Sequence, residues 1–243
     1  MARINKFLSE AGVCSRRAAD KLIDEGRVLV NGELPEKGAS VSEEDVITVD
    51  GKPVKLEKEE IVIAFNKPVG LVCTAGSKEN GKRVRNVIDY INYPKRIYPV
   101  GRLDKDSEGL LLLTNQGELT NRILKSRFGH EKEYYVETNK TITDDMIKRM
   151  SEGVKIYDEE KSIDTVTKPC SITRAGDKSF RIILKQGINR QIRRMCESEG
   201  LRVILLRRER VMNIELSDLK KGEYRPLTDK ELLELKRECG LNG

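Results

Sequence analysis

The segment Gly101-Arg-Leu-Asp-Lys-Asp-Ser-Glu-Gly109 leads directly into Leu110-Leu-Leu-Leu-Thr114, so a charged, glycine-flanked turn precedes a strongly apolar run. The run is too apolar for an exposed sheet edge and is typical of a strand buried on both faces. A carboxylate at the mouth of a buried strand can sit in a partly desolvated cleft, where charge interactions are stronger. We therefore expect a buried strand at residues 110–114, with a candidate reactive site in front of it.

The rest of the chain beyond residue 59 mixes strand and helix patterns. Apolar runs predict further strands at residues 61–65, 134–138 and 180–184. Helical spacing predicts helices at about 117–126, 143–152, 190–199 and 228–239, with a capping box of Thr228 and Glu231 in the last. This mixture predicts an α+β domain with a mixed, mainly antiparallel sheet flanked by helices.

The first 58 residues follow a different pattern. Apolar spacing predicts a helix at residues 3–11 and a second one that begins after Ser15 and ends at Gly26. Strand-and-turn signatures follow at residues 27–32 and 46–51. We predict a small α/β domain over residues 1–58 and a larger domain over residues 59–243, joined by the charged stretch at 57–60.

Composition excludes several classes of protein. Of the 243 residues, 37% are hydrophobic and 35% charged, and the longest apolar run is far short of a membrane span of roughly 20 residues. The first residues carry no signal-peptide core, so we expect a cytoplasmic protein. Five cysteines without a CxxC pair, and a single histidine, disfavour a disulfide framework, a metal site and a His-based triad. Carboxylate, Tyr, Lys and Arg side chains must therefore supply the chemistry.

Basic side chains gather at the starts of two predicted helices. A cation there opposes the helix dipole, and each destabilises the helix by about 0.3–1 kcal/mol. The residues concerned are Arg16, Arg17, Arg190, Arg193 and Arg194. A local violation of this kind is expected at a functional site, and free amides with Arg side chains form a site for phosphate. We interpret both helix starts as phosphate-binding; the alternative is that these arginines pair with nearby acids.

Asp104 is the candidate reactive group. Arg102 and Lys105 flank it and would favour its ionised form. An ionised aspartate is a plausible nucleophile, or a stabiliser of positive charge at a sugar carbon. Asp106 and Glu108 are alternative candidates for the same role. In addition, acidic residues in loops are usually helix caps or members of surface ion pairs.

Four motifs together resemble a known family. They are residues 66–70, residues 101–111, residues 131–134 and residues 187–195. Their order and sequence are similar to those of pseudouridine synthases, in particular the RsuA branch that modifies bacterial ribosomal RNA. Residues 3–54 resemble the S4 RNA-binding domain that precedes the catalytic domain in this branch. Residues 130–134, 189–196 and 210–213 are most similar to F-type synthases of the large subunit, and a departure from them is expected at 157–161.

The resemblance implies a chemical role for three residues. Asp104 would attack the target uridine, either at the sugar C1′ or at the base, and the released uracil would rotate and rejoin the ribose through C5. Tyr134 would pack against the flipped base, and Arg193 would pair with Asp104 and orient it. Such an isomerisation needs no cofactor and no metal.

The resemblance also implies RNA as the partner, with 23S ribosomal RNA or its precursor as the first expectation. For the oligomeric state, which the sequence does not give, we expect a monomer. In the S4-like part, Arg3, Lys6, Arg16 and Arg17 would grip a stem. The RNA-contacting residues implied for the larger domain are Arg102, Leu103, Lys105, Lys132, Asn189, Arg190, Gln191 and Arg194.

Three alternatives stay open at this point. The same chemistry could act on a tRNA stem-loop. A non-catalytic RNA-binding ribosome-assembly factor could keep the architecture, although the presence of Asp104, Tyr134 and Arg193 disfavours it. A glycoside or nucleoside hydrolase could use Asp104 with a second carboxylate, and it would release free uracil.

Overall fold

The structure, a computed structural model, describes residues 1–42, 44–74, 78–79, 81–125, 129–158 and 162–241. Its internal contacts divide the chain into two compact units. One unit contains Met1–Ile61 with Tyr93–Tyr98 and Thr114–Gly117, and the other contains Val62–Asn92, Pro99–Leu113 and Glu118–Gly243. Each unit has its own apolar core.

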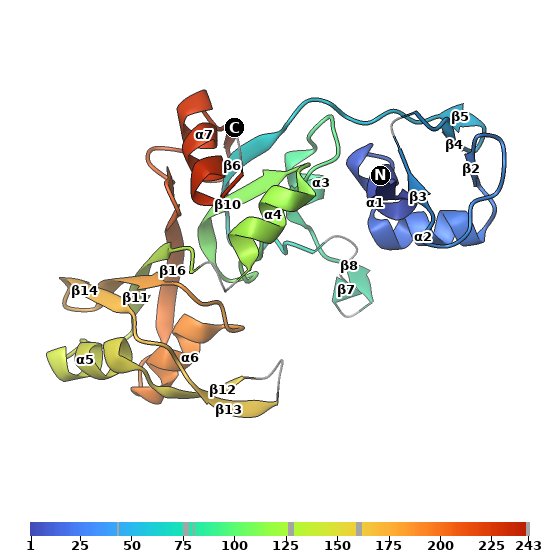
Figure 1. Ribbon diagram of the computed structural model, residues 1–243. Coiled ribbons are helices and arrows are strands. Elements are labelled where there is room, and N and C mark those ends of the chain that lie inside the picture. Colours follow the sequence, from blue (N-terminus) through green and yellow to red (C-terminus); the bar gives the residue numbers. More distant parts are fainter. Residues whose placement is uncertain (43, 75–77, 80, 126–128, 159–161, 242–243) are drawn as a thin grey trace. The chain divides into compact units, whose positions relative to one another are not determined.

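Two helices and short strands form the first unit (Figure 1). Their bounds are β1 (Ala2–Arg3), α1 (Ile4–Glu10), α2 (Arg16–Asp24), β2 (Val28–Val30), β3 (Ser40–Val41), β4 (Ile47–Val49) and β5 (Lys52–Pro53). The Ser15 hydroxyl accepts a hydrogen bond from the backbone N of Ala18 at 3.2 Å, which confirms the predicted cap. Ile4, Leu8 and Val28 lie in the core, and both predicted helices are confirmed.

One large sheet forms the frame of the second unit. Its strands are β6 (Val62–Lys67), β9 (Tyr98–Pro99), β10 (Glu108–Thr114), β11 (Lys132–Thr138), β14 (Ser171–Gly176), β15 (Ser179–Leu184), β16 (Val203–Val211), β17 (Ile214–Glu215) and β18 (Tyr224–Pro226). The order along the sheet is β14-β15-β11-β16-β10-β6-β18, with β17 beside β16 and β9 beside β10. β10 runs parallel to β16, whereas β11 is antiparallel to both β15 and β16. The predicted α+β fold with a mixed sheet is confirmed.

Helices pack against this sheet around two separate cores (Figure 1). They are α3 (Val87–Ile91), α4 (Gly117–Leu124), α5 (Asp144–Glu152), α6 (Gln191–Ser198) and α7 (Asp229–Glu238). One core joins Leu110 and Leu112 of β10 to Ile123 of α4 and Leu235 of α7. The other joins β11 and β15 to α5 and α6, around Phe180. The predicted capping box at the start of α7 is present.

Two hairpins complete the second unit: β7 (Lys78–Glu79) with β8 (Lys82–Arg83), and β12 (Lys155–Asp158) with β13 (Ile163–Val166). The sequence did not predict strands at β12 and β13. This hairpin includes the start of the stretch 157–161 where a departure from F-type synthases was expected, and residues 159–161 lie outside the described residues.

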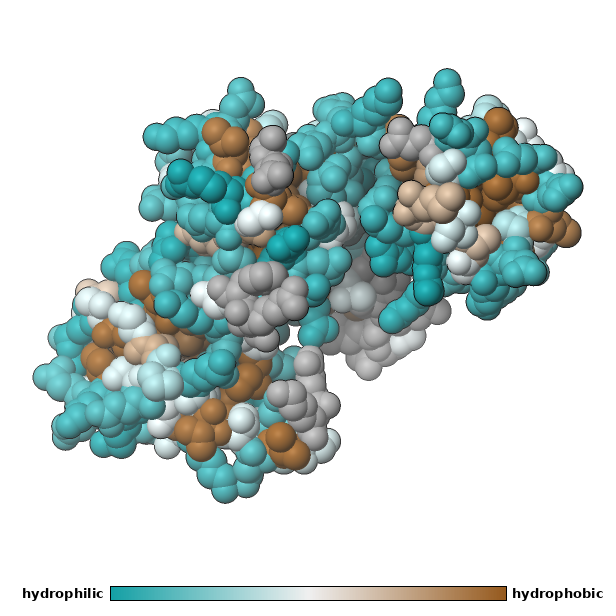
Figure 2. Space-filling model, viewed as in Figure 1, coloured by the Kyte–Doolittle hydropathy of each residue, from teal (hydrophilic) through white to brown (hydrophobic). Residues whose placement is uncertain are grey.

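Hydrophilic residues cover most of the face seen in Figure 2, with smaller hydrophobic areas between them, as the charged composition leads one to expect. In the described part of the chain, no helix combines the length and the apolar character that crossing a membrane requires.

Candidate active site

Residues 103–107, here called the aspartate loop, enter β10 from the charged turn that the sequence analysis singled out. Lys67, at the end of β6, is fully buried, and its ammonium group lies beneath this loop. Its Nζ donates hydrogen bonds to the carbonyl oxygens of Asp104 at 3.1 Å, Ser107 at 2.7 Å and Pro68 at 3.1 Å. Burial lowers the pKa of Lys67, and the three carbonyl dipoles offset part of the cost of burying its charge.

The remaining carbonyl groups of the aspartate loop also have partners from distant parts of the chain. The three contacts are Leu103 O with Cys73 Sγ at 3.3 Å, Lys105 O with the Gly70 backbone N at 2.7 Å, and Asp106 O with Arg193 Nη2 at 2.9 Å. Every backbone carbonyl from 103 to 107 is thus held from outside the loop. A loop restrained in this way presents its side chains in one orientation.

The Asp104 carboxylate forms its ion pair with Arg190, at 3.6 Å between Nη1 and Oδ2. Arg190 also lies 3.4 Å from the Asp106 carboxylate. Its backbone is left-handed, with φ 51°, and it occupies the N-cap of α6, so the predicted helix begins at Gln191 and not before. A non-glycine residue in this conformation costs of order 1–3 kcal/mol, and such strain clusters at functional sites.

The expected ion pair between Arg193 and Asp104 is wrong for this structure. Arg193 lies one turn further along α6, and its guanidinium is occupied by the stretch just after Asp104. It lies 3.3 Å from the Asp106 carboxylate and donates to the Asp106 carbonyl and the Ser107 hydroxyl, the latter at 3.2 Å. Because its side chain is only 9% exposed, Arg193 fixes the loop from behind, while Arg190 faces Asp104.

A cleft of about 480 Å³ opens in front of the aspartate loop, between the two cores of the second unit. Most of the predicted site residues line it: Arg102, Leu103, Asp104, Lys105, Lys132, Tyr134, Asn189, Arg190 and Gln191. Gln191 is buried, and its Oε1 accepts a hydrogen bond from the backbone N of Ile188, so part of its side chain is used inside the protein. Asp104 and Tyr134 thus share one cavity, although Asp104 lies in the loop before β10 and Tyr134 lies on β11.

Of the residues predicted for the larger domain, Arg193 and Arg194 do not line the cleft. The Arg194 guanidinium donates instead to the Tyr157 carbonyl oxygen at 2.5 Å and to Asn189 Oδ1 at 3.3 Å, so it ties the β12–β13 hairpin to α6. At the start of this helix, Arg190 and Arg193 pair with acidic side chains. This arrangement matches the alternative to phosphate binding that the sequence analysis considered.

The first unit presents its basic residues differently. Arg16 and Arg17 are exposed and form no ion pair with any acid in the described ranges. Arg3 is also exposed, whereas Lys6 pairs with Glu10 at 3.6 Å. The side chains of Arg3, Arg16 and Arg17 therefore remain available to an external anion.

Sequence reasoning missed two cations of the site, Lys67 and Arg208. Lys67 was noted only as part of a motif. Arg208 is 3% exposed, lines the cleft, and donates from Nε to the Leu110 carbonyl at 2.7 Å. The signal for Arg208 was available: alternation along a strand puts it on the opposite face from Arg207 and Glu209.

Comparison with known proteins agrees with this geometry. The sequence profile described as RNA pseudouridylate synthase matches residues 61–198, and the S4 domain profile matches residues 2–47. The chain belongs to the RNA pseudouridylate synthase family. The synthase is therefore an isomerase, as the resemblance implied, and membership of the RsuA branch is confirmed.

Curated relatives and one solved structure match the synthase along almost its whole length. It is 48% identical to the dual-specificity RNA pseudouridine synthase RluF of Escherichia coli strain K12, over 96% of this chain and 78% of that protein. It is 37% identical to the ribosomal large subunit pseudouridine synthase B of Bacillus subtilis strain 168, over 97% of this chain and 96% of that protein. A crystal structure of a pseudouridylate synthase matches with a TM-score of 0.69 at 28% identity, covering 97% of this chain and all of that one.

Proposed function

We propose that the synthase converts a specific uridine of large-subunit (23S) ribosomal RNA to pseudouridine, with Asp104 as the nucleophile. The observation that carries the proposal is the aspartate loop, whose restrained backbone presents Asp104 in the same cleft as Tyr134. The name of the Bacillus subtilis relative supports the large-subunit substrate. The dual specificity in the name of the Escherichia coli relative favours a second RNA substrate, for which a tRNA stem-loop is our candidate.

The proposed reaction begins when the target uridine leaves its stack, at a cost of a few kcal/mol, and enters the cleft. The Asp104 carboxylate, kept beside Arg190, attacks the sugar C1′ or the base, and the N1–C1′ bond breaks. The ring turns while it is held in the cleft, and C5 then bonds to C1′. The proton on C5 is lost and N1 carries one in the product, so the reaction is an isomerisation.

Three residues have distinct roles in this scheme. Asp104 reacts with the substrate, and Tyr134 packs against the flipped ring near the C5 proton. Arg193 is a positioning residue, because it contacts the backbone and side chains at 106–107 and not the cleft. Removing Arg193 would leave the Asp106 carbonyl and carboxylate without this partner and loosen the loop that carries Asp104.

We further propose that residues 1–58 grip an RNA stem through Arg3, Lys6, Arg16 and Arg17, while residues 59–243 hold the target nucleotide. Contacts to phosphate release counterions, so affinity should fall as salt rises. In the larger domain, the proposed RNA contacts are the predicted residues that line the cleft: Arg102, Leu103, Lys105, Lys132, Asn189, Arg190 and Gln191. The synthase is proposed to act as a monomer in the cytoplasm.

The decisive experiment maps pseudouridine in ribosomal RNA and tRNA from cells that lack the gene, with rescue by wild type, Asp104→Asn and Asp106→Asn. We expect wild type to restore a site in large-subunit RNA and Asp104→Asn to bind RNA but leave uridine. Asp106→Asn is the matched control, because it removes a neighbouring carboxylate of the same loop, and it should retain partial modification. Restored modification by Asp104→Asn would remove that residue from the mechanism, and release of free uracil would favour a hydrolase.

A further inference from the structure

Two cations that line the cleft, the buried Arg208 and the half-buried Lys132, have no acidic partner among the described residues. Arg208 is 3% exposed and bonds to Leu110 O through Nε alone, so its two terminal nitrogens have no acceptor among the described residues. Lys132 also lines the cleft, and within the described ranges its ammonium forms no hydrogen bond or ion pair. A buried cation without a partner is costly, so its presence needs an explanation.

The strand pairing places these two cations beside Tyr134. Lys132 and Tyr134 are two residues apart on β11 and therefore point to the same face of the sheet. Tyr134 stands directly opposite Arg208 of β16, so their side chains share that face as well. Lys132, Tyr134 and Arg208 thus form one surface inside the cleft.

The acids of the same strands lie on the opposite face. Glu133 pairs there with Arg210 at 3.1 Å, and Glu209 pairs with Arg207 at 2.7 Å. Among the described residues that line the cleft, Asp104 supplies the one carboxylate, and its partner is Arg190. Both cations therefore face a cavity whose one carboxylate, among the described lining residues, already has Arg190 as its partner.

The position of the two cations inside the cleft distinguishes between the anions that RNA can offer. Phosphate groups stay on the RNA backbone, whereas a flipped nucleotide sends its base into the pocket. Uracil is neutral in RNA, but it takes up the electron pair of the N1–C1′ bond when that bond breaks. Its negative charge then spreads over N1 and the carbonyl oxygens. Preorganised donors that face developing charge stabilise the transition state far more than the ground state.

We propose that Lys132 and Arg208 bind the detached uracil ring as an anion, by donating hydrogen bonds to its carbonyl oxygens, and are catalytic residues for cleavage of the glycosidic bond. The inference rests on the proposed function. An Asp104 oxygen supplies the electron pair to C1′ as the N1–C1′ pair moves to the ring. C5 then attacks C1′, the carboxylate leaves with its own pair, C5 loses its proton and N1 gains one. Charge and atoms balance without a further reactant.

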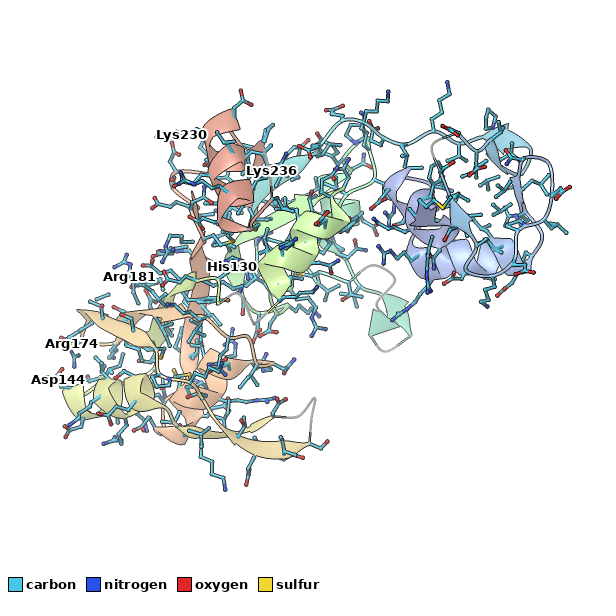
Figure 3. All side chains as sticks on the ribbon, in the orientation of Figure 1. His130, Asp144, Arg174, Arg181, Lys230 and Lys236 are labelled. Carbon is cyan, nitrogen blue, oxygen red and sulfur yellow. The ribbon has the colours of Figure 1, made fainter. Side chains whose placement is uncertain are left out.

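Single-turnover measurements on the full chain test the role of Lys132. The substrate is ribosomal RNA from cells lacking the gene, labelled with tritium at uridine C5, so that reaction releases the label. Lys132→Met should lower the rate roughly 10²- to 10³-fold, while the RNA Kd changes by no more than about threefold. Lys230→Met is the matched control, since Lys230 is an exposed lysine on α7 (Figure 3), and it should keep the wild-type rate.

The pH profile gives a readout that a purely structural lysine would not move. Burial, with a contribution from Arg208, lowers the pKa of Lys132 to about 8. The wild-type rate should therefore fall as pH rises through about 8, because the ammonium loses its proton, and Lys132→Arg should stay active to higher pH. The other ionisable groups that line the cleft are the same in both proteins: Cys73, Arg102, Asp104, Lys105, Lys125, His130, Tyr134, Lys185, Arg190 and Arg208.

A second variant, Arg208→Met, should also lower the rate, and thermal denaturation must show that it folds because Nε binds the Leu110 carbonyl. A wild-type rate for Lys132→Met, with Asp104→Asn inactive, would overturn the anion site and leave the proposed function intact. Weaker RNA binding with a shallower salt dependence and an unchanged saturating rate would assign Lys132 to a phosphate and also overturn it. An active Asp104→Asn would instead refute the proposed function itself.

Discussion

Replacing Lys67 by Met is the sharpest test of whether the restrained loop positions Asp104. Met has a similar length but cannot donate a hydrogen bond. The carbonyl oxygens of Pro68 and Ser107 lose the donor that the buried ammonium supplies, whereas the Asp104 carbonyl keeps the backbone N of Ser107 at 3.1 Å. The variant thus unties the loop without touching any side chain that lines the cleft in front of it.

The size of the effect follows from those contacts. A buried acceptor left without its partner costs about 1–3 kcal/mol, so two of them cost about 2–6 kcal/mol. The variant also no longer buries a charged ammonium group, and this offsets part of the loss, so the free energy of unfolding should fall by about 2–4 kcal/mol. For a domain of this size the Tm should fall by about 4–16 °C. A displacement of Asp104 by about 1 Å should lower the single-turnover rate on the order of 10²-fold.

Thermal denaturation and tritium release under single-turnover conditions measure the two effects separately. RNA affinity should stay at the wild-type value, because Lys67 is fully buried and cannot contact RNA. Rates are compared well below the Tm of the variant, so that unfolding does not contribute. If Lys67→Met loses stability but reacts at the wild-type rate, the restraint has no part in positioning Asp104, and the reasoning fails.

Three other predictions address separate features. Arg16→Glu/Arg17→Glu should weaken RNA binding and flatten its salt dependence, and filter binding at several salt concentrations would show an unchanged slope if neither residue contacts phosphate. Gly109→Ala should destabilise the protein by about 1–3 kcal/mol or more, because the Gly109 backbone has φ 101° and the new Cβ would lie 2.3 Å from the Arg208 carbonyl oxygen. An unaltered midpoint of urea unfolding would contradict this. The hydrogen bond from Arg225 lowers the pKa of Glu231 to about 2. The ionised Glu231 should therefore stabilise the folded protein by on the order of 1–3 kcal/mol above pH 4.5, and this contribution should be lost as pH falls toward 2. Urea titration should find the acid dependence of stability reduced in Glu231→Gln.

The sequence predicted elements with strong local signals. The leucine run of β10, the apolar run of β6 and the caps at Ser15 and Thr228 depend on neighbouring residues, and all are present. The β12–β13 hairpin was missed because only Ile156 and Asp158 of β12 are buried, so its alternation is short and mostly exposed. Burial of β12 depends on α6, which begins more than thirty residues further along the chain.

The prediction about Arg193 failed for a related reason. A motif orders residues along the chain, but two arginines three positions apart on one helix face the same loop. Which one meets Asp104 depends on the left-handed backbone at Arg190, a conformation that no local pattern predicts for an arginine. Once the helix begins one residue later than expected, Arg190 reaches the carboxylate and Arg193 falls behind the loop.

The same contacts explain how distant motifs can serve one reactive group. The Asp104 side chain is partly exposed, and its ion pair with Arg190 is long at 3.6 Å, so no single neighbour fixes the carboxylate tightly. Rigidity has to come from its backbone, where donors from Lys67, Gly70 and Arg193 hold successive carbonyl groups. A loop fixed through its backbone leaves its carboxylate free to react. Substitutions behind the loop should therefore change the rate of reaction more than the affinity for RNA, and those at Arg16 and Arg17 should do the reverse.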